Sequence, residues 1–275
     1  MMEISSSSST DCFDSALDYL GWMNKTLEYE LCFDIWNLEK EVRLLQTFDL
    51  YLRMCRRRRN HETCLEQDEE EKDVTSFRIQ NLIKRRMPDL VFACSEYLIH
   101  SRLPGLTQIK SELTIFREAI KLFFETDIKE LCINFLLDCY WLREPELVID
   151  FIDSVSKNLA ELRERNVFGT LKEKLMFWKS FIRFAMLQGQ QLIDLLIHAE
   201  VVAINALRLI SIWWFDREGE VRNETELQIS QLIGEKIIPS DPQVRETYIH
   251  VLTASKLSRS SDTSALEKNK HLVVD

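Results

Sequence analysis

Apolar residues recur in this chain at alternating spacings of four and three, and this periodicity limits its fold more than any other feature. Because an α-helix has 3.6 residues per turn, such a series lies along one side of a helix and predicts a stripe that faces a core. The charged residues Glu39, Lys40, Glu41 and Arg43 lie mostly off the first stripe. The stripes are Leu27, Leu31, Ile35, Leu38, Val42 and Leu45; Leu106, Ile109, Leu113, Phe116, Ile120 and Phe123; Val148, Ile152, Val155, Leu159 and Leu162; and Leu171, Leu175, Trp178, Phe181 and Ile182.

The scarcity of turn-forming residues points the same way. The 275 residues include only 6 Gly and 5 Pro, whereas sandwiches, barrels and dinucleotide-binding folds use these residues in their many turns. Long helices with short connections need few of either. The sequence therefore predicts an all-α fold, a multi-helix bundle of long amphipathic helices, with two packed sub-bundles as an alternative arrangement.

Changes in composition predict how the chain is divided. Residues 1–10 are Ser-rich and are expected to form a disordered tail, and residues 11–56 an N-terminal helical segment that Gly21 weakens. Residues 57–74 hold arginines and then an acidic run, which favours a charged flexible linker. Residues 75–257 are predicted as the main helical bundle. Residues 258–275 are expected to be loose and then to start a truncated helix, because the chain ends on apolar residues without a cap.

Local signals inside the main bundle predict its breaks. Pro88 is expected to interrupt a helix, and Pro104-Gly105 to form a turn. Residues 166–169 are predicted as a loop, after which Thr170 and Glu173 form a capping box that opens the next helix.

Charge and targeting signals bear on partners and compartment. The net charge of −10 disfavours nonspecific binding to nucleic acid, whose phosphates would be repelled. The N-terminus has no signal-peptide pattern, and no run of about 18 apolar residues predicts a transmembrane segment. Seven cysteines without paired short spacing are typical of reduced thiols. We expect a cytoplasmic chain, with peripheral membrane association as an alternative.

The sequence contains few patterns that are typical of catalytic or metal-binding sites. It contains no GxxxxGK[ST], GxGxxG, GxSxG or HExxH motif, so neither a phosphate-binding loop nor a familiar catalytic motif is present. Cys55, His61 and Cys64 form the closest approach to a zinc site, but the neighbouring arginines disfavour it. His198 and His250 are expected to be structural. We therefore predict no enzymatic activity, no catalytic residue, no cofactor and no metal in this chain.

The densest aromatic cluster is Trp213-Trp214-Phe215. Consecutive helical side chains point about 100° apart, so these three cannot all enter one core. Packing at a helix end is the favoured interpretation, and a candidate interaction surface is the alternative.

Several long stretches carry a resemblance to a known family. They are EPELVIDFIDSV (Glu144–Val155), LKEKLMFWKSFIRFAMLQG (Leu171–Gly189), LLIHAEVVAINA (Leu195–Ala206) and DPQVRETYIHVLTASKLSRSS (Asp241–Ser261). With these stretches the chain resembles the N-terminal region of the late-blight resistance proteins of potato and its solanaceous relatives. In that family this region precedes a coiled-coil segment, a nucleotide-binding switch domain and leucine-rich repeats.

The resemblance implies a non-enzymatic role in detecting pathogen effectors and regulating the hypersensitive defence response. The implied partners are the receptor's own downstream domains or the full-length receptor, and a pathogen effector or a guarded host protein. ATP or ADP would bind only to the downstream switch domain. A free-standing, truncated helical adaptor that modulates full-length receptors is the alternative, and an all-helical enzyme ranks last because no clustered carboxylates or histidines support it.

Overall fold

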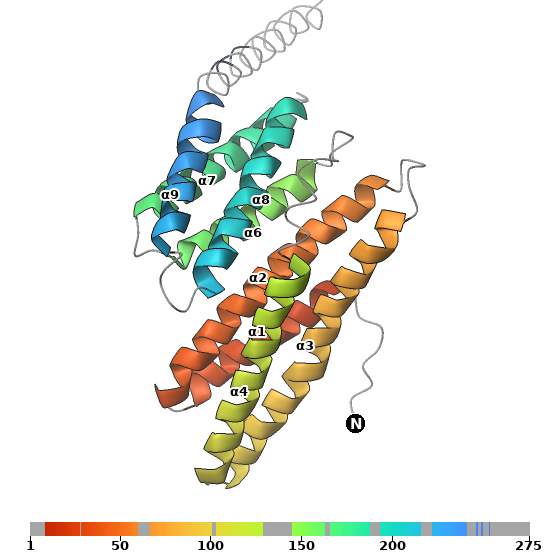
Figure 1. Ribbon diagram of the computed structural model, residues 1–275, viewed down its shortest axis with the longest axis vertical. Helices are drawn as coiled ribbons and strands as arrows, with labels where there is room; N and C mark the ends of the chain where they lie inside the picture. Colours follow the sequence, from red (N-terminus) through yellow and green to blue (C-terminus); the bar gives the residue numbers. More distant parts are fainter. Residues whose placement is uncertain are drawn as a thin grey trace, which may run out of the picture. The chain divides into compact units, whose positions relative to one another are not determined.

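The computed structural model describes residues 9–27, 29–59, 67–100, 103–128, 145–162, 166–187, 193–215 and 222–240, together with 246, 249 and 253. Nearly all of these residues are helical, and no strand occurs among them. The predicted all-α, multi-helix fold is therefore confirmed. Figure 1 shows the helices in chain order.

The chain divides into two compact units. The first comprises Met1–Leu142 with Ile210–Arg217, and the second comprises Arg143–Leu209 with Glu218–Asp275. Two units agree with the two-part alternative of the sequence, but the division falls elsewhere. It lies between Leu142 and Arg143, and again on either side of Ile210–Arg217, and not in the charged stretch 57–74.

The first unit is a bundle of four helices, α1 (Ser9–Thr26), α2 (Tyr29–Arg59), α3 (Gln67–His100) and α4 (Leu103–Phe123). The central pair is α2 and α3, which pack against each other, while α1 and α4 each contact both of them (Figure 1). A single π-helical turn, η1 (Phe124–Ile128), continues α4. The end of α8 (Ile193–Phe215) belongs to this unit from Ile210 onward.

The predicted stripes form the core of this unit. All six apolar residues of the first stripe are buried, Leu27 just before α2 and the other five on it, and five of the six on α4 are buried as well. Each large aliphatic side chain removed from water stabilises the fold by about 1.5–3 kcal/mol. Helical period alone thus identified an inward-facing stripe on α2 and on α4.

Polar contacts align the helices of the first unit. Asp49 of α2 is fully buried and accepts hydrogen bonds from Ser76 Oγ at 2.6 Å and from Gln80 Nε2 at 3.3 Å, both on α3. Its second oxygen pairs with Arg53 Nε at 2.9 Å. A buried carboxylate is tolerated only when such donors surround it, so these contacts fix the register of α2 against α3.

The second unit contains α6 (Pro145–Ala160), α7 (Asn166–Leu187), α8 up to Leu209, α9 (Arg222–Leu232), the π-helical turn η2 (Ile233–Ile237) and the 3₁₀ turn η3 (Ile238–Ser240). In this unit α6 and α7 pack along each other, and α9 contacts α7. Both predicted stripes are buried, on α6 (continuing to Leu162, just past its end) and on α7. Trp178 of α7 is completely enclosed.

Three local predictions differ from the structure. Helix α3 continues through Pro88 without interruption. Pro88 and Lys84, four residues earlier, are both exposed, so water can satisfy the carbonyl that loses its partner. Pro104 and Gly105 belong to the first turn of α4 rather than to a separate turn. Proline is favoured at this position because the first helical amides have no intrahelical partner.

The third difference concerns the start of α7, which begins at Asn166 and not at Thr170. The Thr170 hydroxyl donates to the carbonyl of Asn166 at 3.1 Å. Such a bond one turn back satisfies the hydroxyl inside a helix, so Thr170 is no N-cap here.

The charged stretch 57–74 also differs from the expected linker. Helix α2 extends to Arg59 and α3 begins at Gln67, so both ends of the stretch are helical. Since α2 and α3 pack together in one unit, the stretch connects two helices of that unit. Residues 1–8, 60–66 and 254–275 lie outside the described residues, as do most of 241–253, so the predicted truncated helix and most of the predicted tail 1–10 lie there too. The last two residues of that tail, Ser9 and Thr10, begin α1 instead.

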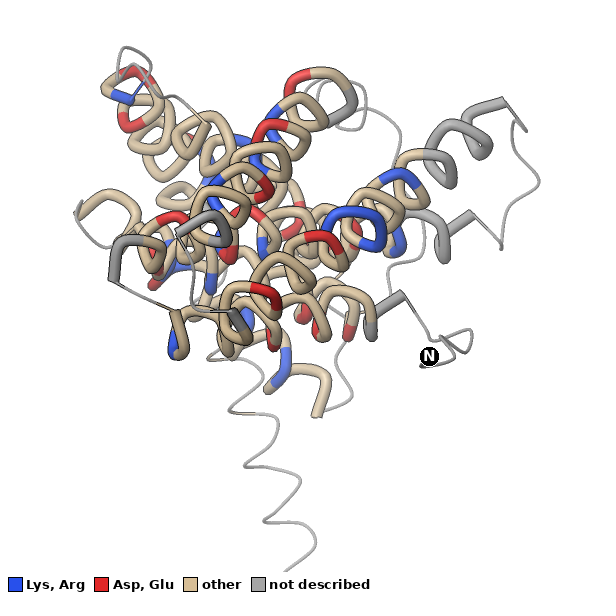
Figure 2. The backbone as a smooth tube through the Cα atoms, turned by 90° about the horizontal axis from the view of Figure 1, so that it is seen from below, with Lys and Arg blue, Asp and Glu red and all other residues tan. Residues whose placement is uncertain are grey.

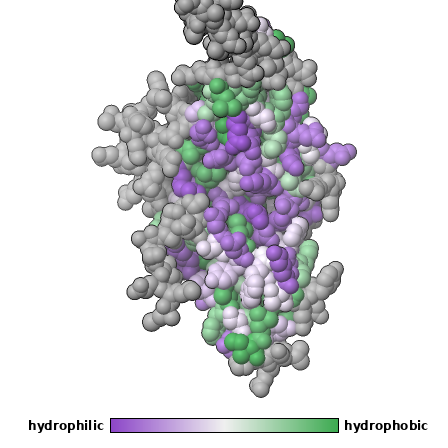
Figure 3. All heavy atoms as spheres, turned by 180° about the vertical axis from the view of Figure 1, so that it is seen from behind, coloured by the Kyte–Doolittle hydropathy of each residue, from purple (hydrophilic) through white to green (hydrophobic). Residues whose placement is uncertain are grey.

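Charged residues of both signs are interspersed along the helices (Figure 2). The face seen in Figure 3 carries hydrophobic patches between hydrophilic ones, one of them at the lower end of the view. Some large apolar side chains are well exposed, which makes contacts with other proteins a reasonable use of this surface. The most exposed are Phe33, Phe77, Phe92, Ile99, Leu122, Leu187 and Ile249.

Candidate interaction surface

The aromatic residues singled out in the sequence meet aromatic residues of α2 within the first unit. The ring of Trp214 lies 5.9 Å from that of Trp36, centroid to centroid, in a tilted arrangement. Trp213 and Trp214 lie 6.3 Å apart. Trp213, Trp214 and Phe215 are each partly buried, so none of the three enters the core completely. This agrees with the geometric expectation that consecutive positions cannot share one core.

Phe215 points to a different partner from Trp214. Its ring lies 4.5 Å from that of Phe124, which in turn meets Phe48 edge-on at 5.2 Å. Phe48 and Phe124 are 3% and 5% exposed. This buried row anchors the end of α8, because aromatic pairs add to the free energy gained by burial alone.

Phe33 is the exposed member of the group, and sequence reasoning missed it. Its ring stacks on Trp36 at 6.3 Å, yet the side chain is 69% exposed. The ammonium of Lys40 lies 5.1 Å from the Trp36 ring centre, within the range of a cation–π interaction. Phe33, Trp36 and Lys40 are spaced by three and four on α2, which places them on one side of the helix. We call Phe33, Trp36, Trp213 and Trp214 the aromatic surface.

The aromatic surface is suited to binding rather than to catalysis. A ring held by a second ring loses little entropy on binding, and aromatic residues are enriched among the residues that dominate binding energy at protein interfaces. Among the described residues around it, Lys40 holds its ammonium over a ring. No nucleophile paired with a base occurs among these residues.

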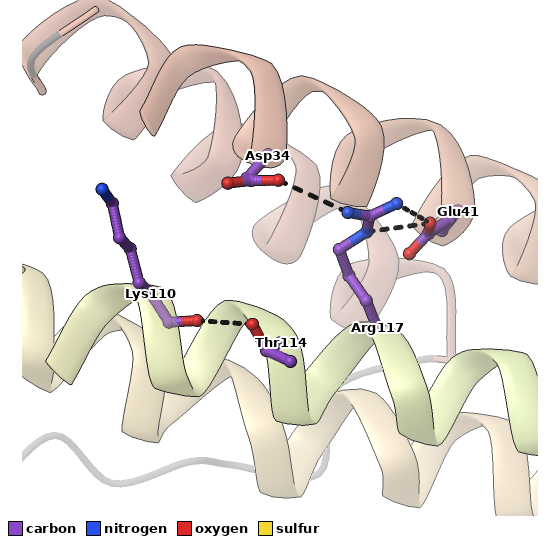
Figure 4. A network of polar contacts seen from close by, with 5 residues as sticks. All are labelled: Asp34, Glu41, Lys110, Thr114 and Arg117. Atoms are coloured by element: carbon purple, nitrogen blue, oxygen red, sulfur yellow. Dashed lines mark hydrogen bonds and ion pairs between the residues drawn. The ribbon is translucent and has the colours of Figure 1, made fainter. Parts of the chain in front are cut away.

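Beside the aromatic surface, Arg117 of α4 reaches across to α2 (Figure 4). Its guanidinium donates to Glu41 and Asp34, so a charged network ties the two helices together. Glu41 is 2% exposed, although the sequence placed it mostly off the buried stripe. The reason is that α2 is covered on several sides, by α1, α3 and α4.

Other titratable groups lie apart from the aromatic surface. In the second unit Asp153 of α6 is bonded by Lys179 of α7 and by Lys157. Burial favours its neutral form, but hydrogen bonds from Lys179 and Lys157 outweigh this and hold the pKa of Asp153 below its ordinary value of 3.8. In the first unit burial raises the pKa of the Cys94 thiol to about 11. At neutral pH the Asp153 carboxylate is therefore ionised and the Cys94 thiol is neutral, so both are poor acid–base catalysts.

Metal-binding residues do not gather in the part of the chain that the structure describes, where no group of three His, Cys, Asp or Glu side chains could hold an ion. Of the sequence candidates, His61 and Cys64 lie outside the described residues, and the Cys55 side chain is not described either. His198 packs on Trp178 at 5.3 Å, and its Nε2 lies 2.6 Å from the Lys236 carbonyl. These contacts join α7, α8 and η2, which is a structural role. His250 is outside the described residues.

Comparison with known proteins identifies the family of this chain. The sequence profile described as "NB-LRR: Late blight resistance protein R1" matches residues 117–274, more than half of the chain.

The chain belongs to the late blight resistance family.

That membership makes it part of a plant disease-resistance family. Neither the curated proteins nor the solved structures contain a match. The family match begins at Arg117 and includes Trp213 and Trp214, whereas Phe33 and Trp36 precede it. The late blight resistance profile thus covers the α8 half of the aromatic surface, and the α2 half lies outside it.

Helix α8 of this family member is long and apolar enough to cross a bilayer, judged by length and composition alone, and it is the one described helix for which this holds. The sequence alone predicts no transmembrane segment here. In the structure, 61% of its most apolar window is buried inside the protein, as in a core helix.

Proposed function

We propose that this chain is a non-enzymatic regulatory module of an NB-LRR disease-resistance receptor, acting in effector perception and in control of the hypersensitive response. It works through protein–protein contacts. Its partners are the receptor's own downstream domains or the full-length receptor, and a pathogen effector or a guarded host protein. It acts in the cytoplasm and binds no nucleic acid.

The observation that supports this proposal is the exposed ring of Phe33, stacked on Trp36 inside the aromatic surface. Family membership supplies the biological setting, and the aromatic surface supplies a place where a partner can bind. A partner that covers Phe33 in only one receptor state would bind the two states with different affinities. Such a difference is what allows a module to shift a switch.

Co-precipitation tests the proposal. The chain is co-expressed in leaves with the nucleotide-binding domain of a late blight resistance receptor, with and without the matching effector. We expect the chain to precipitate with that domain and Phe33→Ala to reduce the yield several-fold. The effector is expected to alter the yield for the unmodified chain only.

Phe77→Ala is the matched control. Phe77 is 65% exposed, against 69% for Phe33, and it lies on α3 with no ring partner among the described residues. Equal losses for both variants would show that apolar exposure alone drives the association. No loss for Phe33→Ala would remove the aromatic surface from the proposal.

Nucleotide binding provides a separate test of the non-enzymatic part. Since the sequence lacks a phosphate-binding loop, we expect no saturable binding of ATP or ADP in isothermal titration calorimetry. Micromolar affinity for either nucleotide would contradict this part and leave the contact surface to be tested on its own.

A further inference from the structure

A second surface feature lies on the first unit, formed by α1 and α3. It is an open groove with a volume of about 510 Å³. The groove is lined by Ser15, Asp18, Tyr19 and Trp22 of α1 and by Val91 and Ser95 of α3. None of these residues belongs to the aromatic surface, so the groove is a site of its own.

The spacing of the lining residues shows that the groove runs along α1 and α3. Ser15, Asp18 or Tyr19, and Trp22 follow one another at three to four residues and form a row along one side of α1. The row is about two helical turns long, roughly 10 Å. Val91 and Ser95 form the facing row on α3. Two such rows leave a channel into which the side-chain ridge of a third helix can pack.

Three of the six lining side chains, Tyr19, Trp22 and Val91, present apolar surface to the groove. Tyr19 and Trp22 are 48% and 42% exposed, which is unusual for side chains of this size. The Ser95 hydroxyl donates to the Val91 carbonyl of its own helix at 2.9 Å, so it needs no further partner. Large exposed rings gain the most free energy when apolar side chains pack against them and remove them from water.

Asp18 carries the one charge among the six residues that line the groove. Asp18 is exposed and has neither an ion pair nor a side-chain hydrogen bond with another residue of the described part of the chain. A cation beside it would gain an ion pair on docking. The net charge of −10 repels a second copy of this chain and an anionic lipid surface alike. Charge complementarity thus selects a basic occupant.

We propose that this groove docks a basic amphipathic helix from a partner protein. The helix presents apolar side chains at spacings of three and four to Tyr19, Trp22 and Val91, and a Lys or Arg at the edge of that stripe to Asp18. This is the helix-in-groove mode of recognition, in which the apolar stripe supplies affinity and the edge charge supplies orientation. The proposal goes beyond the function assigned to the aromatic surface and does not depend on it.

A designed peptide provides the probe. It is a fluorescein-labelled helix about four turns long with a Leu and Phe stripe and one Arg at its edge, and its partner peptide carries Glu in place of that Arg. Binding to the purified chain is measured by fluorescence anisotropy. We expect the Arg peptide to bind about fivefold more tightly than the Glu peptide, as a partly exposed ion pair allows.

Charge reversal in the protein separates this proposal from simple hydrophobic adhesion. Asp18→Lys should invert the preference, so that the Glu peptide binds more tightly. Asp89→Lys is the control, since Asp89 is exposed on α3 but does not line the groove. It should leave the preference for Arg unchanged. Trp22→Ala should weaken both peptides at least tenfold, and Phe77→Ala neither.

Three results would overturn the proposal. The first is an unchanged preference in Asp18→Lys while circular dichroism shows the variant folded. The second is self-association in sedimentation velocity that Trp22→Ala abolishes, which would assign the groove to a second copy of the chain. The third is co-sedimentation with phosphatidylserine vesicles that depends on Trp22, which would assign it to a lipid surface.

Discussion

Arg117 and Glu41 form a forked ion pair between α4 and α2. Both Nε and Nη2 of Arg117 donate to the same oxygen, Glu41 Oε1, at 3.0 and 2.9 Å. The Glu41 side chain is 3% exposed and that of Arg117 23%. Asp34 completes the network at 3.4 Å from Nη1, but its side chain is 41% exposed. The rigid guanidinium reaches two carboxylates at once, which a lysine ammonium at the same position could not match.

We therefore expect Arg117→Met to destabilise the first unit by about 2–4 kcal/mol, because it removes the ion pair of a buried carboxylate. Arg117→Lys should restore only part of the loss. Asp34→Asn should lower the free energy of unfolding by less than about 0.5 kcal/mol, because the contact between Asp34 and Arg117 is long and the Asp34 side chain is exposed. Urea denaturation followed by circular dichroism measures all three. Equal effects for Arg117→Met and Asp34→Asn would show that Glu41 does not depend on this pair.

Gly21 offers a stabilising substitution. It lies within α1, and a Cβ built there meets nothing within 4 Å. Gly21→Ala should raise the free energy of unfolding by about 0.5–1 kcal/mol, because alanine loses less backbone entropy in a helix. The expected readout is a higher melting temperature at unchanged helical signal. A lower melting temperature would indicate that the glycine has a packing role.

Asp153 predicts a pH dependence for the second unit. The pKa of Asp153 in the folded chain is below the unfolded value of 3.8. Its contribution to the free energy of unfolding is therefore fully present well above pH 3.8 and is lost as the pH falls through the folded pKa. Asp153→Asn should lower stability at pH 7 by about 1–2 kcal/mol and should flatten the acid side of the stability curve. Thermal melts from pH 7 down to acid measure both effects.

The two lysines around Asp153 provide the comparison. Lys179 is 12% exposed and Lys157 is 71% exposed. Lys179→Met should therefore reproduce most of the Asp153→Asn effect, whereas Lys157→Met should have little. The reverse order would mean that the exposed pair holds the carboxylate.

Cys94 should resist alkylation in the folded chain. The side chain is completely buried, and its pKa near 11 keeps the thiol neutral at pH 8, whereas the reactive species is the thiolate. Mass spectrometry after iodoacetamide treatment should find Cys94 unmodified under native conditions and modified in urea. Rapid native labelling would show that the first unit opens around α3.

Much of the fold follows from periodicity. The stripes on α2, α4, α6 and α7 could be assigned to the core from sequence because the helical repeat determines which side chains share a face. Single-residue signals were less reliable. Pro88 and Pro104 were interpreted as breaks, but the effect of a proline depends on whether its lost hydrogen bond lies in solvent or in the first turn. That information comes from the packing and not from the residue.

The aromatic surface was only half predictable. Trp213 and Trp214 drew attention through their density in the sequence, but their partner Trp36 is distant along the chain and is revealed only by the fold. Phe33 lies off the buried stripe of α2, where a single phenylalanine is an ordinary surface residue. Its spacing of three from Trp36 was the one signal that could have identified it. The groove beside α1 requires two helices and therefore leaves no trace in either segment alone.

The pairing of Trp36 with Trp214 also bears on how the protein is made. The contacts among α1, α2, α3 and α4 join helices that follow one another in the chain, and such local contacts form rapidly. A ribosome delivers Trp214 only after all of these helices have been synthesised. The four helices can thus assemble while Trp36 still lacks its later partner, and a nascent chain would display that ring to chaperones until the end of α8 arrives.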